Sequence, residues 1–182
     1  MTYKVVYIIG SLSSTSVNRK LVGAMIADAP EDLEFVEANF SQLPLYSPDL
    51  EADYPQAATE FKTILEEADA VLIASPEYDR SIPGGLKNAI DWMGRPWGSN
   101  PIGGKPLYVV GASVGAVGAA LGQAAVRQTL SFFNPLNMTQ PEMFLQANAD
   151  SFGEDGRFVD AETQAFVKSA VEAFAEFIRR HA

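Results

Sequence analysis

YKVVYIIGSLSSTSVNRKL, residues 3–21, joins an apolar run to a hydroxyl-rich turn and a helical pattern. Residues 3–9 are β-branched or aromatic almost throughout, which is typical of a strand buried on both faces of a parallel sheet. Val17, Leu21 and Met25 then recur at helical spacing, behind a serine that can cap the first turn. The stretch therefore predicts a strand, a turn and a helix, the opening unit of a parallel α/β sheet.

The rest of the chain repeats this alternation of strand and helix. Further strands are expected over 33–38, 70–74 and 107–110, with a last strand between 136 and 145 that two prolines interrupt. Helices are expected at about 56–68, after Pro83, after the glycines that follow residue 110, and from Asp160 onward. Five such strands predict a doubly wound α/β sheet with helices on both faces, in one domain over residues 1–182.

The composition limits the possible partners and location of the 182-residue chain. Its formal net charge of −10 argues against nucleic acid or an anionic membrane as a partner. The absence of cysteine excludes disulfides and thiol chemistry and fits a reducing compartment. The first residues lack the features of a signal peptide, so a cytoplasmic location is expected. Residues 107–126 are uncharged, but a strand, a glycine loop and a helix start explain them better than a membrane span.

The turn GSLSSTSVN, residues 10–18, is suited to hold a phosphate. The hydroxyl groups of Ser11, Ser13, Thr15 and Ser16 and the amide of Asn18 can all donate hydrogen bonds near a helix N-terminus. The alternative is that these residues only cap the helix and form a loop. Neither GxxxxGK[ST] nor GxGxxG follows the first strand, so the turn favours a mononucleotide over a triphosphate or a dinucleotide.

Two further loops are expected at the same edge of the sheet, because the carboxyl ends of parallel strands meet there. In SPEYDRSIPGG, residues 75–85, prolines stiffen the backbone and Tyr78 offers an aromatic face. In GASVGAVGAA, residues 111–120, the glycines allow either close approach to a planar ligand or tight packing of strand on helix. The three loops together predict a ligand-binding crevice.

Acid–base and metal chemistry have weaker support. The single histidine, His181, lies next to the C-terminus, which argues against a catalytic triad or a histidine-ligated metal. Glu77, Asp79 and Asp91 could form a carboxylate pair or a magnesium site, but solvated ion pairs, with Arg80 adjacent to Asp79, are the favoured interpretation. We therefore predict no catalytic side chain and no metal ligand.

The three loops resemble those of the NADPH-dependent FMN reductase family, which includes quinone and chromate reductases. The most specific motif is SPEYDRSIPGGLKNAIDW, residues 75–92, and the similarity covers nearly the whole chain. The resemblance implies a flavodoxin-like sheet of order 2-1-3-4-5, non-covalently bound FMN, and homodimers or homotetramers. It also implies hydride transfer from NAD(P)H through the flavin to a quinone, a flavin, an azo compound or a metal oxyanion.

The resemblance also assigns residues to the FMN site. It places Ser11, Ser16, Val17 and Asn18 at the phosphate, Pro76, Glu77, Tyr78 and Asp79 along the isoalloxazine ring, and Ser113 and Gly115 at its pyrimidine edge. The chain has Ser13 where members often have an arginine at the phosphate, Asp79 where they often have asparagine, and Ala119 where they often have glycine. A flavodoxin-like one-electron carrier, which the acidic composition suits, and a flavin-binding protein without turnover are the alternatives.

Overall fold

In the computed structural model, which describes residues 1–182, parallel strands form a single twisted layer in the order β2-β1-β3-β4-β5. This confirms the predicted order. The strands are β1 (Tyr3–Ile9), β2 (Leu33–Glu37), β3 (Ala70–Ala74), β4 (Pro106–Ser113), β5 (Leu136–Met138) and β6 (Phe144–Gln146).

The last strand differs from the prediction, because it is divided in two. β5 pairs with β4 at Pro106–Tyr108, and β6 pairs with β4 at Gly111–Ser113. Pro141 lies between β5 and β6 and has no N–H to donate to a ladder. The region 136–145 therefore holds the last strand as expected, but as two short pieces on either side of Pro141.

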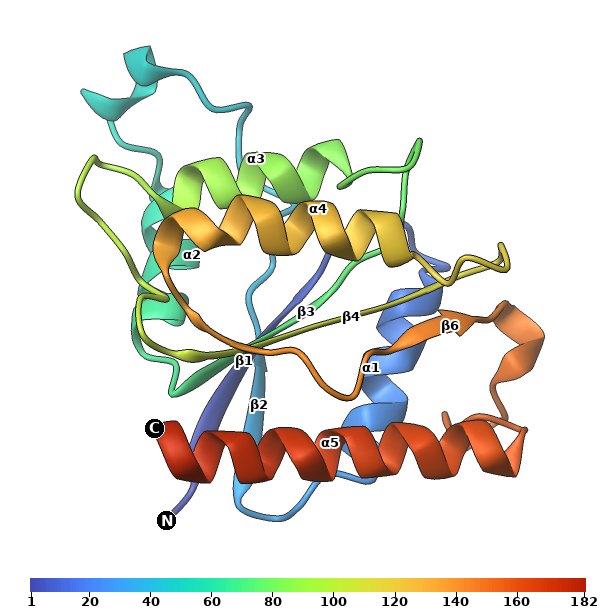
Figure 1. Cartoon of the computed structure of the whole chain (residues 1–182). Coiled ribbons are helices and arrows are strands. Elements are labelled where there is room, and N and C mark those ends of the chain that lie inside the picture. The colour runs from blue at the N-terminus through green and yellow to red at the C-terminus, as the bar shows by residue number, and fades with distance from the viewer.

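Helices cover both faces of this sheet (Figure 1). One face carries α1 (Val17–Ala27) and α5 (Ala161–His181), and the other carries α2 (Gln56–Glu66), α3 (Gly84–Met93) and α4 (Ala120–Leu130). Neighbouring residues of a strand enter opposite cores: Val5 packs with α1 and α5, and Val6 packs with α2 and α3. This two-sided burial explains why the strands are apolar throughout rather than alternating.

The predicted helix starts are confirmed by their caps. The Ser16 hydroxyl accepts from the N–H of Arg19 at 3.2 Å, and the Asp160 carboxylate accepts from the N–H of Thr163 at 2.8 Å. Residues 107–126 form most of β4, a loop and the first part of α4, and no helix combines the length and apolar character that a membrane crossing requires.

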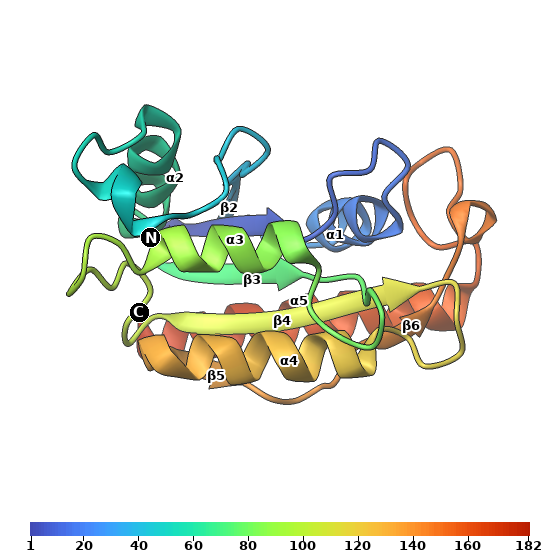
Figure 2. The same cartoon turned by 90° about the horizontal axis from the view of Figure 1, so that it is seen from above.

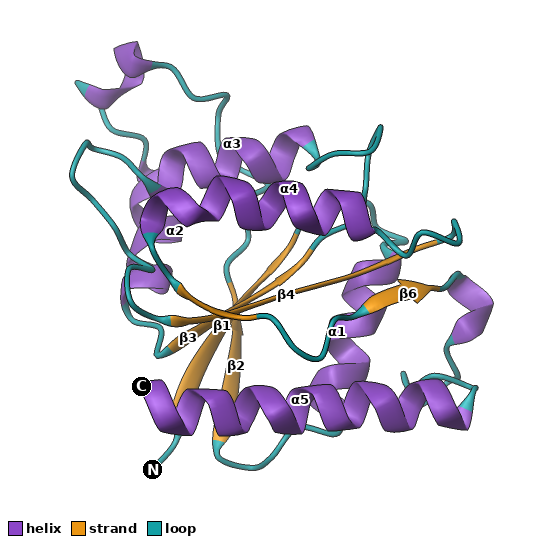
Figure 3. Ribbon diagram, in the orientation of Figure 1, coloured by secondary structure: helices purple, strands orange, loops and turns teal.

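The loops that follow β1, β3 and β4 leave the sheet at the same end (Figure 2). The same end carries the N-termini of α1, α3 and α4, whereas the chain termini lie at the opposite end (Figure 3). The fold therefore brings the three predicted loops to one edge.

Candidate functional site

The turn between β1 and α1 presents free backbone donors. The N–H groups of Val17 and Asn18, in the first turn of α1, make no hydrogen bond, and neither does that of Ser14. The first N–H groups of a helix have no partner within it and carry its positive end. Because α1 has no acidic residue in its first turn, no carboxylate of that turn competes with a bound anion for the N–H groups of Val17 and Asn18.

Hydroxyl groups surround these donors. Ser11 Oγ accepts from the N–H of Ser13 at 3.3 Å, and Ser13 Oγ lies 3.1 Å from Thr15 Oγ1. Ser11 and Ser16 act as acceptors in their hydrogen bonds, so their own hydroxyl hydrogens remain free to donate. The turn can therefore bind a phosphate through amides and hydroxyls alone.

The side chain of Asn18 is used within the protein and does not face a ligand. Its side-chain Nδ2 donates to the carbonyl of Ala112 and its Oδ1 accepts from the N–H of Ala112, both at 2.9 Å, and the residue is only 2% exposed. The prediction that this amide donates to a phosphate is wrong, because the amide is buried against β4. What Asn18 offers a ligand is its backbone N–H, while its side chain fixes the phosphate turn to the end of β4.

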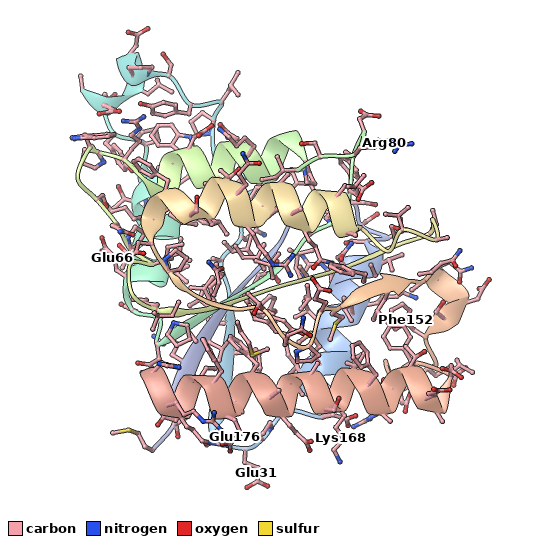
Figure 4. The ribbon with its side chains drawn as sticks, viewed as in Figure 1. Glu31, Glu66, Arg80, Phe152, Lys168 and Glu176 are labelled. Atoms are coloured by element: carbon pink, nitrogen blue, oxygen red, sulfur yellow. The ribbon has the colours of Figure 1, made fainter.

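The loop after β3 contains a two-residue hairpin. The N–H of Tyr78 donates to the Ser81 carbonyl at 3.1 Å, and the N–H of Ser81 donates back at 2.9 Å. The central residues, Asp79 and Arg80, have φ angles of 51° and 64°, the left-handed conformation that Asn and Gly adopt most readily in such turns. Arg80 lies at the outer tip of this loop (Figure 4).

Glu77 anchors the same loop to α4. Its Oε2 accepts from the N–H of Leu121 at 2.9 Å and from that of Gly122 at 3.0 Å. A Cβ at Gly122 would lie 2.9 Å from the Pro76 carbonyl oxygen, so only glycine lets the loop come this close. Glu77 thus fills the positive end of α4 with a carboxylate from the protein itself.

The glycines at the end of β4 and in the loop after it have different roles. A Cβ at Gly111 would collide with the Ser75 carbonyl oxygen, and one at Gly118 would collide with the backbone of Phe144. At Gly115 a Cβ would meet only Ser113 Oγ, at 3.9 Å. Gly111 and Gly118 are therefore needed for packing, whereas the backbone at Gly115 is open to an incoming group.

The carboxylates singled out in the sequence do not act together. Asp91 pairs with Lys87, one turn earlier on α3, at 2.7 Å. Asp79 and Arg80 form no ion pair, so that part of the favoured interpretation is wrong. The two residues are the exposed central positions of a turn, where water solvates each charge.

Exposed apolar side chains come from all three loops. They are Leu12 after β1, Tyr78 after β3, and Val114 and Val117 after β4, and Tyr78 is 51% exposed. Exposed apolar residues next to unpaired donors are typical of a site for a planar ligand with a polar end. The fold is that of a doubly wound α/β protein, and this site is suited to a phosphate-bearing, ring-containing ligand.

Comparisons with known proteins identify the family within this class. The chain matches the NADPH-dependent FMN reductase model over residues 3–150. It is 38% identical over 179 residues to a 2-hydroxy-1,4-benzoquinone reductase from a Burkholderia species, covering 98% of each chain. It is 39% identical over 178 residues to a quinone reductase from Pseudomonas putida, covering 97% of this chain and 95% of that one.

A solved structure agrees with this assignment. FerB from Paracoccus denitrificans, a flavoenzyme NAD(P)H:(acceptor) oxidoreductase, superposes with a TM-score of 0.94 at 40% identity, with 99% of each chain covered. The chain belongs to the NADPH-dependent FMN reductase family. It is an oxidoreductase whose cofactor is FMN and whose co-substrate is NAD(P)H.

The residues present fit FMN. The unpaired N–H groups of Val17 and Asn18 suit the phosphate, and the open backbone at Gly115 and the exposed ring of Tyr78 suit a planar ring system.

Sequence reasoning missed the anchoring roles of Asn18 and Glu77. For Glu77 a signal exists: the residue at the N-cap of α4 is Ala119, which has no side-chain acceptor, so the helix needs a cap from elsewhere.

Proposed function

We propose that the chain is an NAD(P)H-dependent quinone reductase, in which the three loops hold FMN and leave one face of its ring open to substrates. The relatives in Burkholderia and Pseudomonas putida are named as reductases of quinones. The observation that carries the proposal is the convergence of a donor-rich phosphate turn, an exposed tyrosine and an open glycine backbone at one edge of the sheet.

Each predicted residue has a proposed role in this site. The backbone N–H groups of Val17 and Asn18 and the hydroxyls of Ser11, Ser13 and Ser16 bind the phosphate. Pro76 and Tyr78 border the ring, with Glu77 and Asp79 in the same loop, and Ser113 and Gly115 meet the pyrimidine edge. Bound FMN supplies hydride transfer between NAD(P)H and the acceptor. The protein binds, orients and shields, and no side chain acts as a nucleophile.

Homo-oligomerisation is part of the proposal. The apolar residues around the site, including Val114 at 71% exposed and Leu12 at 60%, are a large surface to leave in water. Contact with a second copy would cover them, in a homodimer or a homotetramer. We place this protein, one FMN-binding domain over residues 1–182, in the cytoplasm, where NAD(P)H is supplied. Light scattering after size exclusion measures the assembly, and a monomer at micromolar concentration would contradict this part.

Spectroscopy and turnover test the function. The purified protein should show flavin absorbance in a 1:1 ratio to the chain. Under anaerobic conditions NADPH should bleach it, and 1,4-benzoquinone should restore it over many cycles. Bleaching that never occurs with NADPH or NADH would overturn the reductase assignment and favour the electron carrier. Bleaching that quinones do not reverse would exclude them as acceptors.

A further inference from the structure

A polar hollow of about 160 Å³ lies between the phosphate turn and the segment that follows β2. Residues of the turn (Ser11–Ser14) line one side, residues 37–41 line the other, and Arg19 and Ile9 complete it. No residue of the loops after β3 and β4 takes part. Because β2 and β3 flank β1 on opposite sides, the hollow adjoins the phosphate turn away from the proposed ring site.

An Arg–Glu pair occupies the wall of this hollow. Arg19 Nη1 and Nη2 donate to the two carboxylate oxygens of Glu37, each at 2.7 Å. A guanidinium has five N–H groups, so Arg19 keeps Nε–H and two outer N–H groups for another partner. Hydrogen bonds from Arg19 hold the pKa of Glu37 below its usual range. Glu37 is therefore an ionised acceptor at neutral pH, and its side chain is 25% exposed.

The other lining groups add donors above an apolar floor. Asn39 Oδ1 accepts from the N–H of Ser41 at 2.8 Å, so its Nδ2 hydrogens remain free. The N–H of Ser14 also has no partner. Phe40 and Ile9 are buried beneath, and Leu12 is exposed at the rim. The hollow thus combines an anionic acceptor, several donors and apolar surface, which suits a sugar joined to a base.

The position of Glu37 indicates which sugar. Glu37 is the last residue of β2, next to a turn that opens α1. In the dinucleotide-binding proteins of the related Rossmann type, an acidic residue at the end of the second strand accepts from ribose hydroxyls, while the phosphate lies at the N-terminus of the first helix. We propose that the hollow binds an adenosine 5′-phosphate moiety, with its ribose hydroxyls on Glu37 and Arg19 and its phosphate side toward Ser13 and Ser14.

This inference rests on the proposed function, since the phosphate turn serves both ligands. The same moiety occurs in FAD and in NAD(P)H, so the hollow would either extend the cofactor site or hold the far end of the co-substrate. Both sources share one recognition chemistry, and competition separates them.

The experiment titrates 5′-AMP by calorimetry into the apoprotein and into the FMN-loaded protein. The Glu37→Gln variant should weaken AMP binding about tenfold and leave FMN affinity within about twofold of wild type, because the variant lacks the charged acceptor for the ribose hydroxyls. Glu34→Gln is the matched control: Glu34 is an exposed residue of the same strand outside the hollow, and its variant should bind AMP like wild type.

A second variant tests the hollow independently, in case Glu37→Gln does not fold. Ser41→Trp places an indole in the hollow from an exposed position, and it should abolish AMP binding while FMN still binds. AMP binding to the FMN-loaded protein assigns the hollow to NAD(P)H. The hollow is assigned to FAD if AMP competes with FMN and wild type binds FAD more tightly than FMN. In that case Glu37→Gln should bind FAD no more tightly than FMN.

The inference is overturned if AMP binds neither form, or if both variants bind AMP as wild type does. If the wild-type apoprotein binds AMP but not FMN, the proposed function is contradicted and the AMP site is not.

Discussion

At position 13 a serine stands where the family pattern often has an arginine, and the turn over residues 10–18 carries no positive charge of its own. Arg19, the first positive charge after the turn, is held by Glu37 at 2.7 Å. Arg80, the other candidate, is at the tip of the loop after β3 (Figure 4) and forms no ion pair. We therefore propose that the phosphate is held mainly by backbone N–H groups and hydroxyls of this turn.

Ser13→Arg should tighten FMN binding by about 1–3 kcal/mol, the strength of one charge-assisted hydrogen bond. Fluorescence titration of FMN into the two apoproteins measures this. Ser169→Arg, which adds the same charge on an exposed position of α5, should leave the affinity unchanged. Equal affinities for wild type and Ser13→Arg would show that amides and hydroxyls already satisfy the phosphate.

The hairpin residue Arg80 has a φ of 64°, which costs an L-residue about 1–2 kcal/mol. Arg80→Gly removes this cost and Arg80→Ala keeps it, while both remove the charge. The glycine variant should be more stable than the alanine variant. The difference should be at most about 1 kcal/mol, because the larger unfolded-state entropy of glycine offsets part of the removed backbone cost. Urea denaturation compares the two, and a more stable alanine variant would contradict the turn geometry.

At the scale of secondary-structure elements, Glu77 joins the loop after β3 to the start of α4. Glu77→Ala leaves the N–H groups of Leu121 and Gly122 without an acceptor and should lower the free energy of unfolding by about 1–3 kcal/mol. FMN affinity should fall with it, because Tyr78 is the next residue. Glu77→Gln keeps an oxygen acceptor, so it should retain part of the stability and part of the FMN affinity. Equal losses in the two variants would mean that the charge, not the hydrogen bonds, matters.

The end of α1 is joined through Asp28 to the first turn of α5 and to the segment before it. Its carboxylate accepts from Gln164 Nε2 at 2.7 Å and from Arg157 at 2.9 and 3.0 Å. The hydrogen bond from Gln164, followed by those from Arg157, lowers the pKa of Asp28. A lowered folded-state pKa stabilises the protein above the unfolded-state pKa, near 3.9, and this stabilisation is lost as the pH falls toward the folded-state value.

Asp28→Asn should therefore destabilise the protein at pH 7, by about 1–3 kcal/mol. The difference from wild type should shrink as the pH falls from about 4 toward the lower folded-state pKa of Asp28, because wild-type Asp28 is progressively protonated over this range. Urea denaturation at pH 7 and pH 3 checks this, with Asp155→Asn on the exposed side of Arg157 as the control. A difference that does not depend on pH would show that shape rather than charge holds the junction.

For the whole molecule, FMN should act as a stabilising ligand, because the three loops that we propose to bind it come from distant parts of the chain and lie together only in the folded state. At a free FMN concentration of about 100 times Kd, the gain is about 2.7 kcal/mol. For a chain of this size that raises Tm by about 5–11 °C. Differential scanning calorimetry with and without FMN tests this. Riboflavin, which lacks the phosphate, should give a smaller shift, and an equal shift would contradict the phosphate turn.

The sequence allowed most of the fold to be predicted, because its strands are buried on both faces and leave uninterrupted apolar runs. β1 and β3 begin and end where residues 3–9 and 70–74 indicated. The last strand was predicted only as a region, and its division into β5 and β6 was not, since these are three residues each and pair only with β4. Such short segments carry too little periodicity to be recognised alone.

The sequence by itself determined the class of the protein and the loops that carry its site, because local patterns and motifs are written in neighbouring residues. Only the tertiary structure decided what each side chain does there. It placed the Asn18 amide against Ala112, Glu77 on α4, and Glu37 beside Arg19. These partners lie far apart in the chain, and a polar side chain is committed to whichever partner packing brings within hydrogen-bond distance.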